Sequence, residues 1–290
     1  MNLKSAFQHI DIHSHLNFAA FDGDRNEVLS RAHTAGVAVI TVGTQRDTSQ
    51  KAVAIAEEHP EGVYAIVGLH PVHTSASFHD AKEIGPSFAK ATEGKGGFTS
   101  RGEVFDYDYY KKLAMHPKVV GIGECGLDYY RLESGSEAKQ RETFAAQIAL
   151  ANEAKKPLML HVRSGGGRSA YRDALALLKK DAKVGGNFHF FAGSWDEAKK
   201  ILDAGFSLSF TGVITFTHDY DEVVRETPLD RILSETDSPF VAPASFRGKR
   251  NEPLYVKEVV RTISRIKERE EEEVRTQILE NARRLFGIAL

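Results

Sequence analysis

The chain alternates eight times between a short β-rich run and a longer stretch whose apolar residues recur at helical spacing. The predicted strands are residues 7–13, 36–42, 63–69, 118–124, 157–162, 185–190, 205–210 and 231–237. Between them, segments such as 137–154 and 169–180 place apolar residues three and four positions apart, which is typical of helices that pack one face on a sheet. This alternation predicts a parallel β-sheet covered by helices.

The number of repeats and the length of 290 residues favour a single-domain (β/α)8 TIM barrel spanning 1–290. An open doubly wound sheet is the alternative, disfavoured because no G-x-G-x-x-G opens the first helix. A loop insertion is expected at about 74–108, which is too long for an ordinary connection and includes the glycine-rich patch 93–104. It is either a tolerated insertion or a lid that contacts substrate. The charge run 267–275 predicts a solvated helix surface before a terminal helix.

Composition limits the expected partners. The 38 Lys and Arg against 40 Asp and Glu give a net charge of −2, so any affinity for nucleic acid must come from a local basic patch. The single Cys125 cannot form an internal disulfide, which favours a cytoplasmic location. We expect no membrane segment, because 18 uncharged apolar residues never occur in succession, and no obligate protein partner is indicated.

Potential metal ligands stand at the ends of the predicted strands. His13 and His15 are two residues apart and therefore share one face of the first strand. An isolated pair of this kind is often structural, but barrel enzymes gather their functional residues at the C-terminal ends of the strands. Four further strands end in potential ligands, namely Glu124, His161, His189 and Asp237.

Six converging donors suit two metal ions better than one. A carboxylate buried at the end of an apolar strand costs several kcal/mol unless a cation neutralises it. Six side chains are too many for one tetrahedral catalytic ion with an open position, whereas two ions can share a bridging carboxylate. The predicted arrangement is Glu124 as the bridge, His13, His15 and Asp237 on one ion, and His161 and His189 on the other. Two divalent ions and two carboxylates leave a net positive site, which favours an anionic substrate such as a phosphate ester.

The motifs HIDIHSHL, GLHP, GIGECGLDYY, PLMLHVR, ETDSPF and ENARRLFG, in this order along nearly the whole chain, resemble the TatD family of metal-dependent deoxyribonucleases in the amidohydrolase superfamily. The resemblance implies a TIM barrel, a dinuclear metal centre and hydrolysis of phosphodiester bonds in the cytoplasm. The typical substrate is the 3′ end of single-stranded DNA, trimmed in the 3′-to-5′ direction, and some members also act on RNA. The resemblance transfers metal-ligand roles onto His13, His15, Glu124, His161, His189 and Asp237.

The expected reaction is in-line attack on phosphorus by a metal-activated water, with Glu124 and Asp237 as the candidate catalytic residues. Asp237 would position or deprotonate that water, and the alternative is a strand-end cap on the following turn. The metal is Mg²⁺, Mn²⁺ or Zn²⁺, because imidazoles suit zinc while carboxylate-rich phosphodiesterases often use the other two. Cys125 is not expected to act as a nucleophile, since neighbouring strand residues face opposite ways.

Substrate contacts are expected from the loops around this site. The candidates are His70, Arg163, Arg131 and Arg247, with Lys249 and Arg250 as further cations and Tyr129, Tyr130 and Phe246 as stacking surfaces. Ordinary structural or surface roles are the alternative for each. The segment SGGGR at 164–168 and the long stretch after GLHP depart from the family pattern, and the first is either a phosphate cradle or a flexible loop.

Two other functions remain open. One is an amidohydrolase-type enzyme that cleaves an amide, ester or lactone with the same metal site, although several such relatives bridge their metals with a carboxylated lysine where this chain has Glu124. The other is a non-enzymatic metal-bound scaffold or nucleic-acid-binding module, which the near-neutral charge and the complete donor set disfavour.

Overall fold

A computed structural model describes residues 7–80, 97–100, 102–130, 132 and 135–290. Its central feature is an eight-stranded parallel sheet with the order β1-β2-β3-β6-β7-β8-β9-β10. The strands are β1 (His9–Ser14), β2 (Val37–Val42), β3 (Val63–Val67), β6 (Val119–Asp128), β7 (Leu158–Arg163), β8 (Gly186–Phe188), β9 (Ser207–Phe210) and β10 (Ile232–Ser234). All eight predicted strands are present, and the (β/α)8 barrel is confirmed.

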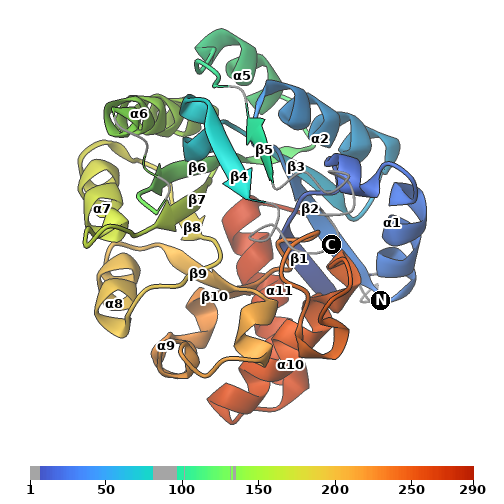
Figure 1. Ribbon diagram of the computed structural model, residues 1–290. Helices are drawn as coiled ribbons and strands as arrows, with labels where there is room; N and C mark the ends of the chain where they lie inside the picture. The colour runs from blue at the N-terminus through green and yellow to red at the C-terminus, as the bar shows by residue number, and fades with distance from the viewer. Residues whose placement is uncertain (1–6, 81–96, 101, 131, 133–134) are drawn as a thin grey trace.

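Helices surround the strands, as Figure 1 shows in a view along the barrel. They are α1 (Arg25–Thr34), α2 (Arg46–Glu58), α5 (Tyr107–Ala114), α6 (Ser136–Ala154), α7 (Ala170–Asp181), α8 (Trp195–Asp203), α9 (Asp221–Glu226), α10 (Val256–Lys267) and α11 (Glu271–Phe286). The predicted helices 137–154 and 169–180 correspond to α6 and α7. None of the helices in the described ranges is long and apolar enough to cross a membrane.

The first and last strands close the barrel through buried polar contacts. Asp11 accepts hydrogen bonds from the backbone nitrogen of Thr236 at 2.9 Å and from its hydroxyl at 2.5 Å. The backbone nitrogen of Asp237 donates to the carbonyl of His13 at 2.9 Å, and Ser14 forms a parallel bridge with Ser238. The segment after β10 is thereby fixed against β1, which brings Asp237 beside His13 and His15.

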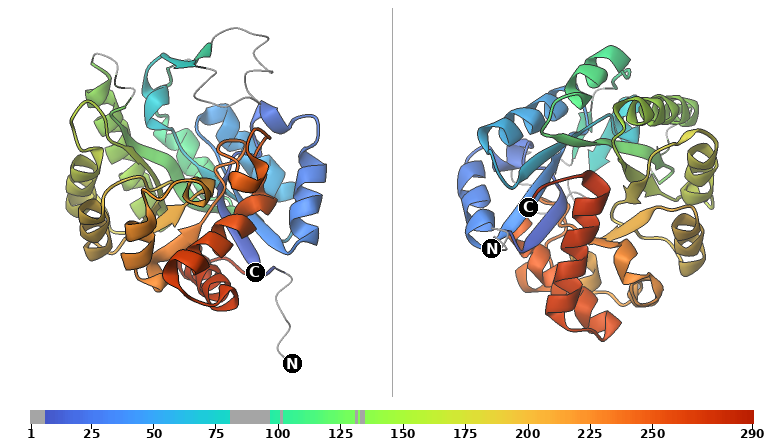
Figure 2. Two further views of the ribbon diagram at one scale, coloured as in Figure 1. Left: turned by 60° about the horizontal axis from the view of Figure 1, so that its bottom comes forward. Right: turned by 180° about the vertical axis from the view of Figure 1, so that it is seen from behind.

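The apolar core has two parts. The larger cluster lies between strands and helices, and it includes Cys125, which is fully buried. The smaller cluster joins strand residues such as Ile10, Ile40 and Met159 to Leu279 and Phe286 of α11. Seen from behind in Figure 2, α11 lies against the strands at the end of the barrel where they begin.

Two details differ from the expectation or extend it. Strand β6 does not end at Glu124 but continues to Asp128, with an irregular register against β7 between Ile122 and Cys125. The interval expected to be an insertion carries an antiparallel hairpin of β4 (Ser77–Asp80) and β5 (Gly97–Ser100), while residues 81–96 lie outside the described part. Figure 2 shows this hairpin on the side of the barrel where the strands end.

Candidate metal centre

The six predicted donors come together at the C-terminal end of the barrel. They are supplied by β1, β6, β7 and the segments that follow β1, β8 and β10. The cluster is largely buried: no member except His161 exposes more than a tenth of its surface. A seventh residue joins them, His70, which follows β3 and was expected to contact the substrate or a group behind the metal ligands, or to be structural.

Glu124 lies at the middle of the cluster, and its two oxygens face different histidines. Oε2 is 3.4 Å from Nε2 of His13 and 3.6 Å from Nε2 of His15. Oε1 is 2.9 Å from both Nδ1 of His161 and Nε2 of His189. A carboxylate that points one oxygen at each of two imidazole groups has the geometry of a bridging ligand.

The donors around this carboxylate include two groups close enough to share an ion, and Glu124 belongs to one of them. His13, His15 and Asp237 form the first, with Nε2 of His15 3.2 Å from Oδ1 of Asp237. The second contains Glu124, His161 and His70, whose Nε2 is 3.1 Å from Oε1 of Glu124. Within each group the ligand atoms lie within 4.8 Å of one another.

Pairs of imidazole nitrogens point at each other across the site. Nε2 of His13 and Nε2 of His15 are 3.2 Å apart, as are Nδ1 of His161 and Nε2 of His189. The same nitrogens also approach carboxylate oxygens. Nitrogen and oxygen donors that converge in this way match the ligands of divalent transition metals, so the residues fit divalent metal ions.

Glu235 is a buried member of the site that sequence reasoning missed. Its Oε1 accepts from the backbone nitrogen of Phe190 at 2.5 Å and from the hydroxyl of Ser209 at 2.8 Å. Its Oε2 lies 3.4 Å from Nδ1 of His189 and 3.7 Å from Nδ1 of His13. Glu235 therefore faces the ring nitrogens of these histidines that point away from Glu124, which suits an orienting partner.

Asp128 orients the histidine of β7 in the same way. Its Oδ2 is 3.0 Å from Nε2 of His161, on the opposite side of the ring from Glu124. The backbone of Asp128 is held by Gln140 of α6, which accepts from its nitrogen at 2.9 Å and donates to its carbonyl at 3.2 Å. The sequence did not identify Asp128 as part of the site, because the strand was predicted to end at Glu124, four residues earlier.

Burial and neighbouring charges shift the pKa values of these groups in opposite directions. Burial raises the pKa of Glu124, but the charges of His70 and His189 hold it well below its ordinary value. Burial opposes protonation of His189, yet the charges of Glu124 and Glu235 raise its pKa well above the usual value. For His13, burial and the charge of His189 lower the pKa. The site thus keeps its central carboxylate ionised and favours positive charge close to it.

Two of the expected substrate contacts, Arg163 at the end of β7 and Arg247 in the segment after β10, are exposed cations stacked on aromatic rings. These two arginines and their aromatic partners are called the rim below. The guanidinium carbon of Arg163 is 3.8 Å from the ring centre of Tyr130, and that of Arg247 is 4.3 Å from the ring centre of Phe216. Both aromatic rings are exposed. Arg131, the remaining arginine of this set, lies outside the described residues.

Other residues considered for substrate contact are engaged within the protein. Arg250 binds the carboxylate of Asp24 through two hydrogen bonds of 2.8 and 2.6 Å. The ring of Tyr129 is buried, and its hydroxyl donates to Asp173 at 2.9 Å. Phe246 stacks on Tyr255 with ring centres 3.8 Å apart, and the Lys249 ammonium lies 6.0 Å from the centre of the Phe246 ring.

The segment at 164–168 is a tight turn. Gly165 and Arg168 exchange backbone hydrogen bonds of 3.3 and 3.0 Å, and the two glycines between them have φ values of 58° and 75°, which a residue with a β-carbon rarely adopts. Arg168 also binds the carboxylate of Glu137 at 2.7 and 2.8 Å. Two of the backbone amides proposed for a phosphate cradle are therefore used inside the turn.

Comparison with known proteins identifies the family of this chain. Residues 10–287 match the protein family described as TatD related DNase. An uncharacterized metal-dependent hydrolase, YabD of Bacillus subtilis (strain 168), is 40% identical over 283 residues that cover 96% of this chain and 98% of YabD. A protein named 3′-5′ ssDNA/RNA exonuclease TatD, from Pantoea vagans (strain C9-1), is 33% identical over 96% of this chain and 99% of its own length. The crystal structure of YJJV, a TatD homologue from Escherichia coli K12, superposes with a TM-score of 0.79 at 25% identity, covering 98% of this chain and 100% of YJJV.

Proposed function

Because the chain belongs to the TatD related DNase family of metal-dependent hydrolases, we propose that it is an exonuclease that removes nucleotides from the 3′ ends of single-stranded DNA, and also of RNA. The observation that carries the proposal is the placement of Glu124, with one carboxylate oxygen facing His13 and His15 and the other facing His161 and His189. This arrangement supports a pair of ions rather than one. A relative of similar length that is named a 3′-5′ ssDNA/RNA exonuclease supports the substrate.

The residues divide between two ions and a bridge. His13, His15 and Asp237 would hold one ion, His161 and His189 the other, and Glu124 both, while His70 stands beside the second group. Divalent ions at such a site supply Lewis acidity toward a phosphoryl oxygen and a water of lowered pKa as nucleophile. Mg²⁺, Mn²⁺ and Zn²⁺ are all compatible with these donors.

The chain's own residues orient this chemistry. Asp237 projects a carboxylate from a backbone with φ of 54°, and Oδ1 lies 3.2 Å from His15, so this carboxylate can position the attacking water and take up its proton. The Asp128 carboxylate lies 3.0 Å from Nε2 of His161, and that of Glu235 faces Nδ1 of His189 at 3.4 Å, each on the side of the ring away from Glu124. These contacts fix the histidine nitrogens toward Glu124.

The rim favours a flexible polyanion. Arg163 on Tyr130 and Arg247 on Phe216 each combine a guanidinium for phosphate with an exposed aromatic ring for an unpaired base. Each arginine attracts phosphate groups only in its own neighbourhood, so the chain can bind nucleic acid although its net charge is −2.

The test uses single-stranded DNA and RNA oligonucleotides labelled at the 5′ end, with free or blocked 3′ ends. We expect a ladder that shortens from the 3′ end with Mg²⁺ or Mn²⁺, no ladder with a chelator, and resistance of the blocked ends. Protein carrying Asp237→Asn and purified identically controls for contaminating nucleases. Turnover of ester or lactone substrates without any cleavage of oligonucleotides would instead favour an acyl-bond hydrolase.

The contribution of the rim is tested separately. Arg163→Ala is expected to raise KM for an oligonucleotide several-fold and to leave kcat nearly unchanged, because the contact is made before and during the reaction alike. Arg265→Ala, which removes an exposed arginine from the last turn of α10, is the matched control. Equal KM values for the two variants would remove Arg163 from the substrate path.

A further inference from the structure

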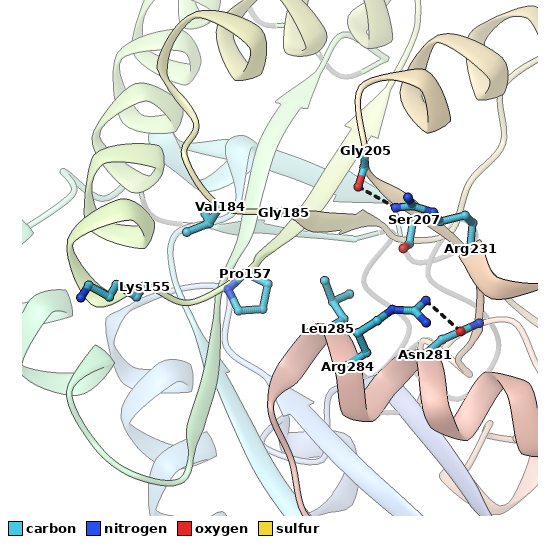
Figure 3. A pocket seen from close by; sticks show the side chains of 10 residues that line it. All are labelled: Lys155, Pro157, Val184, Gly185, Gly205, Ser207, Arg231, Asn281, Arg284 and Leu285. Atoms are coloured by element: carbon cyan, nitrogen blue, oxygen red, sulfur yellow. Dashed lines mark hydrogen bonds between the residues drawn. The ribbon is translucent and has the colours of Figure 1, made fainter.

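A hollow lies at the opposite end of the barrel from the metal centre. Its volume is about 310 Å³, and its lining residues come from α11 and from the beginnings of β7, β8, β9 and β10 (Figure 3). Its lining includes Lys155, Pro157, Val184, Arg231, Arg284 and Leu285. Because parallel strands all begin at one end of a barrel, this hollow is on the N-terminal face.

The same strands connect the hollow to the metal centre. Three residues of its wall each stand four positions before a residue of that centre. The pairs are Pro157 and His161, Gly185 and His189, and Arg231 and Glu235. At about 3.3 Å per strand residue, four positions correspond to roughly 13 Å. A small molecule in the hollow would therefore not touch the metal ligands, so the two sites are distinct.

The hollow concentrates positive charge that the protein does not neutralise. Lys155, Arg231 and Arg284 line it, and no lining residue is a carboxylate. None of the three forms an ion pair with any residue that the structure describes. Elsewhere in the chain arginines such as Arg141 and Arg250 are paired with carboxylates. Two of these cations, Arg231 and Arg284, lie on the same side of the hollow (Figure 3), and unneutralised cations at one place create a local field that attracts an anion.

Hydrogen bonds to uncharged groups hold the two guanidinium groups in place. Nη1 of Arg231 donates to the carbonyl of Gly205 at 3.0 Å. Nη2 of Arg284 donates to the carbonyl of Asp230 and, at 3.0 Å, to Oδ1 of Asn281. A guanidinium carries five N–H donors, so donors on both arginines remain for a ligand. Figure 3 shows the two head groups on one side of the hollow near Ser207, with Lys155 on the other side.

An apolar surface separates these cations. Pro157, Val184 and Leu285 lie between Lys155 and the two arginines in Figure 3. A ligand that fits must therefore carry an anionic group for the guanidinium pair and a compact organic part for this surface. The volume is near the lower limit of roughly 300 Å³ for small-molecule pockets, which restricts that part to about one ring.

We propose that this hollow is a binding site for a small phosphate monoester. A phosphate group accepts several hydrogen bonds and matches the planar fork of arginine, and its double negative charge offsets the charges of Arg231 and Arg284. The proposal does not depend on the identity of the hydrolysed substrate.

Calorimetric titration of the metal-loaded protein with inorganic phosphate and with phenyl phosphate tests the proposal. The metal centre also attracts phosphate, so the wild-type protein should show two binding events. The variant Lys155→Gln/Arg284→Gln should lose one event or weaken it at least tenfold, while hydrolysis in phosphate-free buffer stays unchanged. Lys179→Gln/Lys199→Gln, which removes the same charge from exposed helix positions, should behave as wild type.

Phenyl phosphate should bind this site more tightly than inorganic phosphate, because only the ester reaches the apolar surface. Identical titrations of all three proteins would overturn the proposal, and equal affinity for the two ligands would overturn the assignment of an organic part. A second measurement needs no variant: phenyl phosphate should slow modification of Lys155 by an amine-reactive reagent at least threefold relative to Lys179. Equal rates at a saturating concentration would contradict the site.

Discussion

Replacement of Glu235 by glutamine isolates the role of one buried oxygen. Glu235 is fully buried, and its Oε1 accepts from the Phe190 backbone at 2.5 Å and from Ser209 at 2.8 Å. The carbonyl of glutamine can accept both bonds, so the change in the free energy of unfolding should be limited to about 1 kcal/mol. What changes is the atom that faces the histidines.

The amide nitrogen of the glutamine would face Nδ1 of His13 and Nδ1 of His189, at the position where the carboxylate Oε2 now lies 3.7 and 3.4 Å away. A carboxylate only accepts, so it favours a proton on each Nδ1 and leaves each Nε2 free to bind metal. An amide N–H only donates, so it favours the opposite tautomer, with Nε2 protonated. Because these Nε2 atoms are the ones that face Glu124, both histidines would become poorer ligands.

Loss of such an orienting partner typically weakens metal binding by roughly 10- to 100-fold, or about 1.4–2.7 kcal/mol. Two histidines depend on Glu235, so we expect a change near the upper end for Glu235→Gln. The assay is competition between the protein and a chelating indicator for Zn²⁺ or Mn²⁺, together with activity as a function of metal concentration. Activity should recover at saturating metal.

Ser209→Ala is the matched control, because it removes a donor to Oε1 and leaves the oxygen that faces the histidines unchanged. Its metal affinity should fall less than a few-fold. Wild-type metal affinity in Glu235→Gln would refute the tautomer argument. Failure to bind metal at any concentration, with the fold intact, would show instead that Glu235 is itself a ligand, in line with the group that it forms with His13 and His189.

Two further perturbations separate chemistry from stability. Glu124→Ala or Asp237→Asn should abolish turnover and leave the circular dichroism spectrum unchanged, because barrel stability lies away from the catalytic end. Near-normal activity of either variant in a metal-replete assay would show that the replaced residue is not part of the site. Gln147→Ala should lower the free energy of unfolding, measured in urea, by about 2–4 kcal/mol. The buried amide of Gln147 accepts from the backbone nitrogen of Leu69 and donates to its carbonyl, each at 2.9 Å, and both backbone groups would lose their partner. Glu142→Ala, on the exposed side of the same helix, should change it by less than about 0.5 kcal/mol.

The fold could be predicted because each strand and helix carries its own periodic signal. Strand β2 was predicted at 36–42 and is found at Val37–Val42, and the helix predicted at 137–154 is α6, Ser136–Ala154. A strand boundary is less secure when no turn residue marks it. The strand predicted to end at Glu124 continues through Gly126 to Asp128, since the backbone keeps pairing with β7 beyond the irregularity.

The positions of the six donors could be predicted from their place at strand ends, but their partners could not. The two-residue spacing that makes His13 and His15 a candidate pair also relates Glu235 to Asp237, and this spacing is the signal in the sequence that indicates Glu235. Which oxygen of Glu124 faces which histidine depends on how far the strands are staggered around the barrel, and that stagger is set by the closed sheet as a whole.

Buried glutamines on α6 offer a signal of a different kind. Gln140 and Gln147 are seven residues apart, so both lie on the helix face that packs against the barrel, where an unpaired amide would be costly. Each holds the backbone of one residue beside the site: Gln140 that of Asp128, and Gln147 that of Leu69, which precedes His70. A polar side chain on an apolar helix face must satisfy its hydrogen bonds inside the protein, and at the C-terminal end of a barrel the available backbone belongs to the strand ends and loops that carry the functional residues. Buried amides at this spacing therefore indicate which strand ends are held rigidly, although the sequence does not reveal which backbone groups they bind.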